Sequence, residues 1–190
     1  MCNNYASKVP ATKIAEAFSD TGLGLKFEGS SVPNLEPRDD IRIGDSAPIV
    51  ARQGENVILR ETRWAWKAPS GKPVFNFRSE GRSFTQSDRC LIPADAFYEF
   101  TAAEPGQKRK TKWRFTARSA DWFWIAGTVK DSAFAMLTTE PGPDISPYHD
   151  RQIVILPLSD GVRWLTLARP ESDLLKPATS GTLKVEKVFP

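Results

Sequence analysis

The second residue, Cys2, carries the most distinctive chemistry that the sequence offers. Removal of Met1 would leave an α-amine and a thiol on adjacent carbons. An α-amino group has a pKa of roughly 7.7 to 8.0, so a substantial fraction is neutral and can attack an aldehyde near neutral pH. The thiol can then close on the imine to give a five-membered thiazolidine. Position alone favours the competing interpretation of an incidental cysteine in a frayed terminus.

Two further residues could move protons. His149 is the only histidine and precedes an apolar run, and a pKa near 6.5 suits a proton shuttle, although a lone histidine is more often structural. Glu99 lies in the aromatic run AFYEF. Burial there would raise its pKa toward the range of a general acid, and an exposed strand position is the alternative.

Asn76 and Arg78 lie two residues apart in VFNFR, so on a strand they share one face. An amide beside a guanidinium suits the binding of an amine and a phosphate, but the same alternation is typical of a solvent-exposed strand face. Trp64 and Trp66, which adjoin basic residues, are candidates for stacking the bases of single-stranded nucleic acid. A basic run is interpreted as a solvated turn and comprises Lys108, Arg109, Lys110 and Lys112.

Several kinds of site are excluded by their missing motifs. The chain has no GxxxxGK[ST], no GxGxxG after a strand, no HExxH and no CxxC. With one histidine and two cysteines, Cys2 and Cys90, we expect no zinc site, no other metal and no cofactor. Both cysteines are expected to be free thiols.

Composition indicates one globular domain over residues 1–190. The hydrophobic fraction is 40% and the net charge +3, which permits a polyanionic partner without requiring one. No apolar run is long enough for a signal peptide or a membrane span, so a cytoplasmic address is expected. We expect a monomer.

The hydrophobic pattern predicts many short strands and few helices, hence an α+β domain with an antiparallel, β-barrel-like core and a few short peripheral helices. A helix is expected over residues 11–19, a long surface loop over about 21–40, and a hairpin of APIVAR and NVILRET around Gln-Gly-Glu. The other expected strands are PVFNFR, CLIPADAFYEF, KWRFTAR, WFWIAG, AFAMLTT, QIVIL and LKVEKVF. Further helical segments are expected around SEGRSF and LSDGVRWLTL.

Taken in order, several segments resemble the SOS response-associated peptidase (SRAP) family, whose members bond covalently to abasic sites in single-stranded DNA. The segments are MCNNY, SAPIV, TRWAW, FNFRSE, RCLIPADAFYEF, AMLTTE and HDRQIVIL, which span residues 2 to 156. The resemblance implies that Cys2 is the nucleophile, that Asn76 orients it and that Arg78 contacts a DNA phosphate. It also implies an acidic role for Glu99 and proton transfer by His149, removal of Met1 by the protein itself, and a β-lyase activity.

The sequence departs from the family pattern at three places. Asn3 and Asn4 stand where a glycine and an arginine are usual, which removes a cation. No aromatic follows Ala68-Pro69, where some members carry a tryptophan pair, so stacking would come from Trp64, Trp66 or elsewhere. Gln152-Ile153 replaces a dipeptide that usually ends in proline.

Three hypotheses follow. The first is an enzyme that forms a covalent crosslink with abasic single-stranded DNA through Cys2. The second is a cysteine peptidase that acts on other proteins, for which a Cys-His pair is present but no separate oxyanion-hole motif. The third is a non-catalytic module that binds single-stranded DNA and in which Cys2 is incidental.

Overall fold

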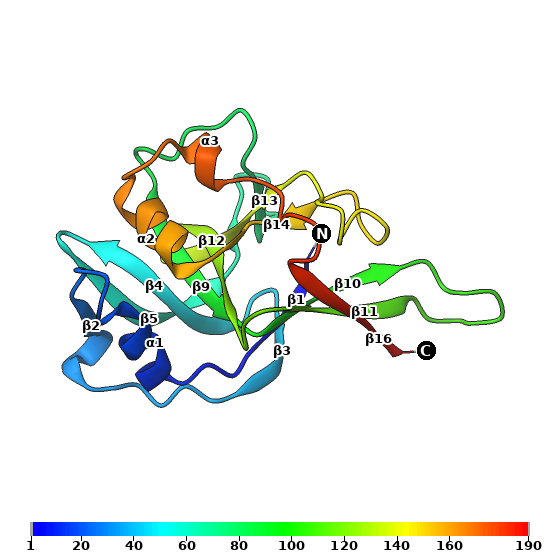
Figure 1. The fold of residues 1–190 in the computed structure, drawn as a ribbon, viewed down its shortest axis with the longest axis horizontal. Helices are drawn as coiled ribbons and strands as arrows, with labels where there is room; N and C mark the ends of the chain where they lie inside the picture. Colours follow the sequence, from blue (N-terminus) through cyan, green and yellow to red (C-terminus); the bar gives the residue numbers. More distant parts are fainter. Residues whose placement is uncertain (1, 190) are drawn as a thin grey trace.

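The structure, a computed structural model, describes residues 2–189 (Figure 1). The helices are α1 (Ala11–Phe18), α2 (Leu158–Thr166) and α3 (Glu171–Leu174), with a 3-10 turn η1 (Glu28–Ser30). The strands are β1 (Asn4–Ser7), β2 (Leu25–Phe27), β3 (Arg38–Arg42), β4 (Ser46–Gln53), β5 (Asn56–Trp64), β6 (Trp66–Lys67), β7 (Pro73–Val74), β8 (Asn76–Arg78), β9 (Asp88–Ala94), β10 (Ala96–Thr101), β11 (Thr111–Ala117), β12 (Phe123–Lys130), β13 (Ala133–Thr139), β14 (Gln152–Ile153), β15 (Ile155–Leu156) and β16 (Leu183–Phe189).

Two sheets dominate the part of the chain that the structure describes. The larger has the order β14-β13-β12-β9-β4-β5-β2, and the smaller has the order β16-β11-β10-β1-β3. Within the larger sheet, β13 pairs with β12 and also, in parallel, with β5, so that β12, β9, β4, β5 and β13 close into a ring. The expected α+β class with a barrel-like core is therefore confirmed, although the ring is not a clean barrel and β8 joins it by a parallel pairing.

The expected strand CLIPADAFYEF is two strands that belong to different sheets. The break is at Asp95, whose backbone N–H donates to Ala6 O at 3.1 Å and whose carboxylate accepts from Lys8 N at 2.6 Å. These bonds fix the point at which the chain leaves the larger sheet as β9 and enters the smaller sheet as β10. The change of sheet brings β10 beside β1, the first strand of the chain.

Apolar side chains fill two layers. One cluster lies within the ring and includes Cys2, Tyr5, Trp64 and Phe134. The other lies between the larger sheet and the helices, where Phe18 of α1 meets Trp124 edge to face at 5.6 Å. Because α1 buries Ile14 and Phe18, the four-residue spacing in the sequence correctly predicted an amphipathic helix.

Other local predictions had mixed outcomes. The β4–β5 hairpin is confirmed, with Gly54 at φ 62° in its two-residue turn. The expected loop over 21–40 was partly wrong, because it contains β2, which pairs with β5, and the start of β3. The segment SEGRSF forms a turn rather than a helix, because Gly81 takes a left-handed φ of 69°. The strand predicted near the end is β16, and α3 was not predicted.

No helix among the described residues is both long and apolar enough to cross a membrane.

Ala65 has a backbone conformation that an L-residue rarely adopts, with φ 90°. It joins β5 to β6, and its N–H donates to Phe134 O at 2.9 Å, which holds the strained geometry in place. Glycine adopts positive φ without this cost.

We therefore expect Ala65→Gly to raise the free energy of unfolding by about 1 kcal/mol, measured by urea denaturation. Ala120→Gly is the matched control, because Ala120 is exposed and is not among the positive-φ residues. The control should lose about 0.4 to 1 kcal/mol of unfolding free energy, because glycine increases the conformational entropy of the unfolded chain. Equal losses in the two variants would show that Ala65 is not strained.

Candidate active site

Cys2 lies directly ahead of β1 and is almost completely buried, with 1% of its surface exposed. Its Sγ donates to Asn4 O at 3.4 Å, and Cys90, the other cysteine, is also a free, buried thiol. Burial, followed by the negative charge of Glu99, raises the pKa of the Cys2 thiol to about 12. The sulfur is therefore a neutral thiol at physiological pH.

Asn76 of β8 holds Cys2 in place through a side-chain hydrogen bond. Strand β8 pairs in parallel with β13, with Asn76 opposite Met136, and this pairing presents the amide toward Cys2. The side-chain Nδ2 donates to Cys2 O at 2.7 Å. The Oδ1 atom is buried and has no hydrogen-bond partner among the described residues. An unsatisfied buried acceptor is unfavourable, so this oxygen is suited to receive an N–H group.

Glu99 reaches the site from β10, close enough for its charge to act on the Cys2 thiol. Its side chain is 3% exposed, and this burial raises its pKa from 4.5 to about 7. The carboxyl group is thus present in both protonation states near neutral pH, as the aromatic neighbours in the sequence predicted for a buried position.

His149 completes the group, with Nε2 3.9 Å from Glu99 Oε2. Its Nδ1 accepts from Arg151 N at 2.9 Å and lies 2.8 Å from Asp150 Oδ1. The two contacts compete, because the first needs Nδ1 without a proton and the second favours a protonated ring. Asp150 is 89% exposed, and burial lowers the pKa of His149, so the neutral ring with its proton on Nε2 fits better.

An ion pair between the buried residue Arg151 and the exposed residue Glu80 fixes the segment that carries His149. Arg151 donates to both carboxylate oxygens of Glu80, at 2.6 and 2.7 Å, and to Thr138 O at 2.9 Å. The Arg151 contact lowers the pKa of Glu80 to about 2. Both residues lie in segments that resemble the family, FNFRSE and HDRQIVIL, but nothing in their spacing indicates that they pair.

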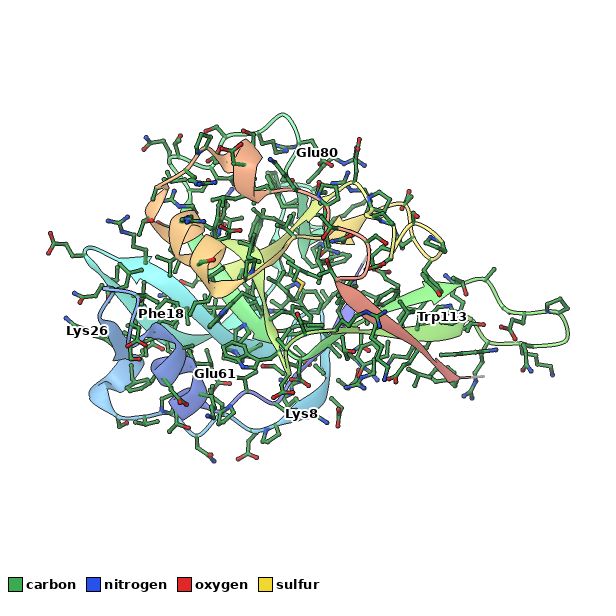
Figure 2. The ribbon with its side chains drawn as sticks, viewed as in Figure 1. Lys8, Phe18, Lys26, Glu61, Glu80 and Trp113 are labelled. Carbon is green, nitrogen blue, oxygen red and sulfur yellow. The ribbon has the colours of Figure 1, made fainter. Side chains whose placement is uncertain are left out.

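Trp113 and Tyr148 form an aromatic wall beside the site, with ring centroids 4.7 Å apart. Trp113 lies opposite Glu99 in the β10–β11 register, and Tyr148 precedes His149. Both rings are partly exposed, and Trp113 lies where β10 and β11 leave the body of the molecule (Figure 2). The sequence did not distinguish Trp113 from the other tryptophans, because its nearness to Glu99 depends on strand pairing.

The expectation that Trp64 and Trp66 form a stacking surface was wrong. Trp64 is fully buried, packs against Tyr5 and Phe134, and donates through Nε1 to Phe75 O at 2.9 Å. Trp66 is 8% exposed. The basic residues next to them do not keep them at the surface. Alternate residues of β5, including Trp64, face the interior of the ring, and Trp66 of β6 packs against Ala133 and Ala135.

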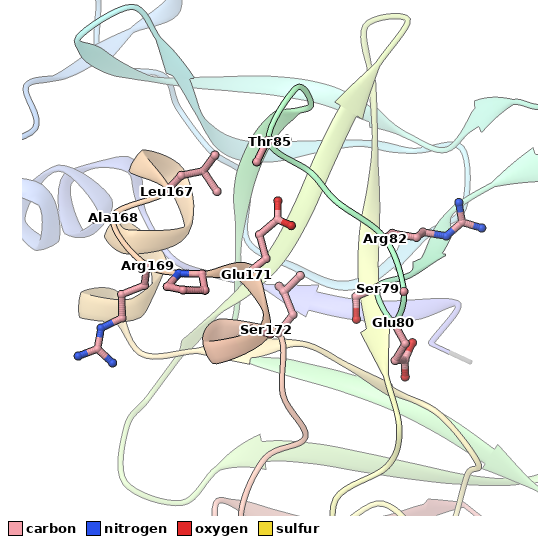
Figure 3. Close-up of a pocket in the computed structure, with 12 residues that line it drawn as sticks. Ser79, Glu80, Arg82, Thr85, Leu167, Ala168, Arg169, Glu171 and Ser172 are labelled. Atoms are coloured by element: carbon pink, nitrogen blue, oxygen red, sulfur yellow. The ribbon is translucent and has the colours of Figure 1, made fainter.

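Arg78 is exposed at the end of β8, two residues from Asn76. Beyond it lies a hollow of about 730 Å³ that begins at Ser79 and Glu80 (Figure 3). Arg82 and Arg169 lie on opposite sides of this hollow, and their guanidinium groups point away from each other. The hollow is therefore adjacent to the candidate site, to which Glu80 connects it through Arg151.

No group of three or more potential metal-binding side chains is present among residues 2–189. Predictions that involve Met1, including its removal, lie outside the described residues.

Comparisons with known proteins show the family of this chain. The sequence model of the SOS response associated peptidase (SRAP) family matches residues 1–190. The chain belongs to this family. Among SRAP relatives, abasic site processing protein YoqW of Bacillus subtilis is 30% identical, with 93% of this chain and 85% of the relative covered. Abasic site processing protein YobE of the same organism is 28% identical, with 93% and 87% covered.

Solved structures share the SRAP-type fold of this chain. A phage-related protein from Bordetella bronchiseptica matches with a TM-score of 0.75 at 20% identity, over 98% of this chain and 94% of that one. A protein from Bacteroides thetaiotaomicron matches with a TM-score of 0.74 at 17% identity, over 99% and 92%. At these identities the comparison shows the fold alone.

The raised pKa of Glu99 has a consequence for stability. The folded protein holds this proton more tightly than the unfolded chain, so the contribution is fully present below about pH 4.5 and is lost as the pH rises through about 7. Glu99→Gln does not titrate. Relative to the native chain, it should gain up to about 3 kcal/mol in unfolding free energy between pH 4.5 and pH 8.

Urea unfolding at several pH values measures this difference. Glu55→Gln is the control, because Glu55 is exposed, and its difference from the native chain should be nearly independent of pH. A difference for Glu99→Gln that is equally flat would show that the carboxyl group titrates normally.

Proposed function

We propose that this SRAP protein captures abasic sites in single-stranded DNA through Cys2 once Met1 has been removed. The observation that carries the proposal is the Asn76 hydrogen bond to Cys2 O, made where Glu99 and His149 also meet. The relatives named abasic site processing proteins support the same substrate. The chemistry at Cys2 then follows from the state of each group.

The amine reacts first, because the thiol beside it is neutral. The free α-amine attacks C1′ of the ring-opened deoxyribose, and the aldehyde oxygen leaves as water, which gives an imine. The Cys2 sulfur then bonds to C1′ while the thiol proton passes to the imine nitrogen. The product is a thiazolidine with one C–N and one C–S bond to the sugar, and no oxidant is required.

Asn76 orients the amine in this scheme. Its Nδ2 fixes the Cys2 carbonyl, and its unsatisfied Oδ1 accepts an N–H of the amine, so that the nitrogen lone pair is directed toward the incoming aldehyde. Met1 must leave before this acceptor can bind a free amine. We include removal of Met1 by the protein itself in the proposal.

Glu99 and His149 divide the proton transfers. Protonated Glu99 donates to the sugar oxygen during ring-opening and to the departing hydroxyl, because its pKa of about 7 makes the acid form available at neutral pH. Neutral His149 transfers protons at the hydroxyl group of the sugar. A β-lyase activity follows if the imine undergoes elimination before the sulfur closes the ring.

The DNA backbone is held by Arg78 in this proposal, because the usual cation near the terminus is missing. Asn4 stands in its place and is 5% exposed, and its Nδ2 donates to Asp40 Oδ1 at 2.5 Å and to Ile41 O at 3.2 Å. An amide held in this way is part of the sheet. With Trp64 and Trp66 buried, Trp113 is the partly exposed aromatic nearest to Glu99 in the strand register.

The raised thiol pKa argues against a general cysteine peptidase, which needs a thiolate. It does not argue against a non-catalytic module that binds single-stranded DNA. The two alternatives differ from the proposal in what they predict for Cys2.

Cys2→Ala keeps the amine of the mature chain and removes the sulfur. We expect this variant to form an imine that borohydride traps on an abasic oligonucleotide, but no adduct that survives denaturing gels without reduction. The native chain should gain the mass of the oligonucleotide minus one water, and Met1 should be absent from every adduct. Intact mass spectrometry measures both.

The control is Cys90→Ala, which removes the other buried thiol and should leave the adduct yield unchanged within about twofold. A stable adduct that persists in Cys2→Ala would contradict the proposal. Equal binding to intact and abasic strands, with no adduct in the native chain, would favour the non-catalytic alternative.

A further inference from the structure

Strands β10 and β11 and the loop 102–110 between them form an arm that extends beyond the body of the molecule (Figure 1). The strands pair from Phe97↔Phe115 to Thr101↔Thr111, and β16 pairs with the outer side of β11. Glu99 and Trp113 lie opposite each other in this pairing. The arm is therefore a continuation of the two strands that form one wall of the site.

The tip of the arm is strongly basic. Lys108, Arg109 and Lys110 are exposed and make no ion pair within residues 2–189. The acidic residue of the loop, Glu104, is already paired, because Lys187 of β16 contacts both of its carboxylate oxygens at 2.7 Å. The three tip cations thus remain available to an anionic partner.

A fourth cation of the arm is used differently. Lys112 lies over the ring of Tyr98, 3.8 Å from its centroid, and burial lowers its pKa. We therefore assign it to packing and restrict the basic surface to Lys108, Arg109 and Lys110.

We infer that these three residues bind backbone phosphates of the single strand that continues from the abasic site. The inference rests on the proposed function, which places the reactive sugar between Cys2 and Glu99. Because strands rise about 3.3 Å per residue, the tip cations lie roughly 10 to 20 Å along the arm from Glu99. At about 3.4 Å per nucleotide or more, this distance corresponds to at most about three to six nucleotides from the reactive sugar.

The location of the basic tip explains how the chain can bind DNA without a cation at position 4. Phosphate contacts supply affinity and fix the register of the strand, and they do not need to lie at the reacting atom. A partly exposed tryptophan at the base of the arm and cations at its tip are the two components of surfaces that bind single strands without sequence preference.

The test compares two oligonucleotides with a central abasic site, one of about 3 nucleotides, whose single flanking nucleotides cannot reach the tip, and one of about 20. In the variant Lys108→Ala/Arg109→Ala/Lys110→Ala, the short oligonucleotide should crosslink as it does with the native chain. With the long one, the concentration for half-maximal crosslinking should rise about tenfold, and the slope of log affinity against log salt should fall in magnitude by about 2.

A matched control removes the same charge from the opposite end of the molecule, through Lys13→Ala/Lys26→Ala/Arg52→Ala on α1, β2 and β4 (Figures 1 and 2). It should leave the half-maximal concentration within about twofold of the native value and the salt slope within about 0.5 of the native slope. Lys108→Arg/Lys110→Arg keeps the charge and should keep native affinity, which separates charge from loop shape.

The arm inference is overturned if the tip variant and the control variant behave alike on the long oligonucleotide. If neither oligonucleotide crosslinks to the native chain, that result contradicts the proposed function and not the arm inference. In that case fluorescence anisotropy with the long strand lacking an abasic site still tests the tip, and a salt slope unchanged by the tip substitutions would overturn the inference.

Discussion

The placement of the first residues of the chain as an interior strand determines the rest of the site. Strand β1 pairs with β10 on one side and with β3 on the other, so its backbone is hydrogen-bonded along both edges. A terminus held in this way does not fray, and Cys2, two residues before the strand, is buried as deeply as the core. The Asn76 amide can donate to Cys2 O at 2.7 Å only because the position of Cys2 is fixed.

Burial changes the ionisation of three groups at the site in one direction, toward the neutral form. The pKa values of the Cys2 thiol and the Glu99 carboxyl rise, and that of the His149 imidazole falls. The environment therefore disfavours thiolate chemistry and favours reactions that begin with a neutral amine and an acid. Charged side chains lie outside this group of three, in the Arg151–Glu80 ion pair and on the exposed residue Arg78.

The sequence predicted the local features of this fold better than the connections between them. Four-residue spacing identified α1, and Gly54 between β-branched runs identified the β4–β5 hairpin, because both depend on neighbouring residues. The division of CLIPADAFYEF at Asp95 depends on contacts with Ala6 and Lys8, almost ninety residues away. For the same reason Trp64 and Trp66 were misjudged, and the Arg151–Glu80 pair was missed. The aromatic neighbours of Glu99 indicated burial but left an exposed strand position open, and the structure shows that its side chain is buried.

The pairing of β1 with β10 also sets an order of events during synthesis. Residues Tyr5 and Ala6 are made first, but their partners Phe97 and Ala96 are synthesised only about 5 to 20 seconds later at ordinary translation rates. Until then β1 lacks the neighbour that encloses Cys2. The burial of Cys2 therefore depends on a strand that is made about halfway along the chain, and it cannot precede the synthesis of β10.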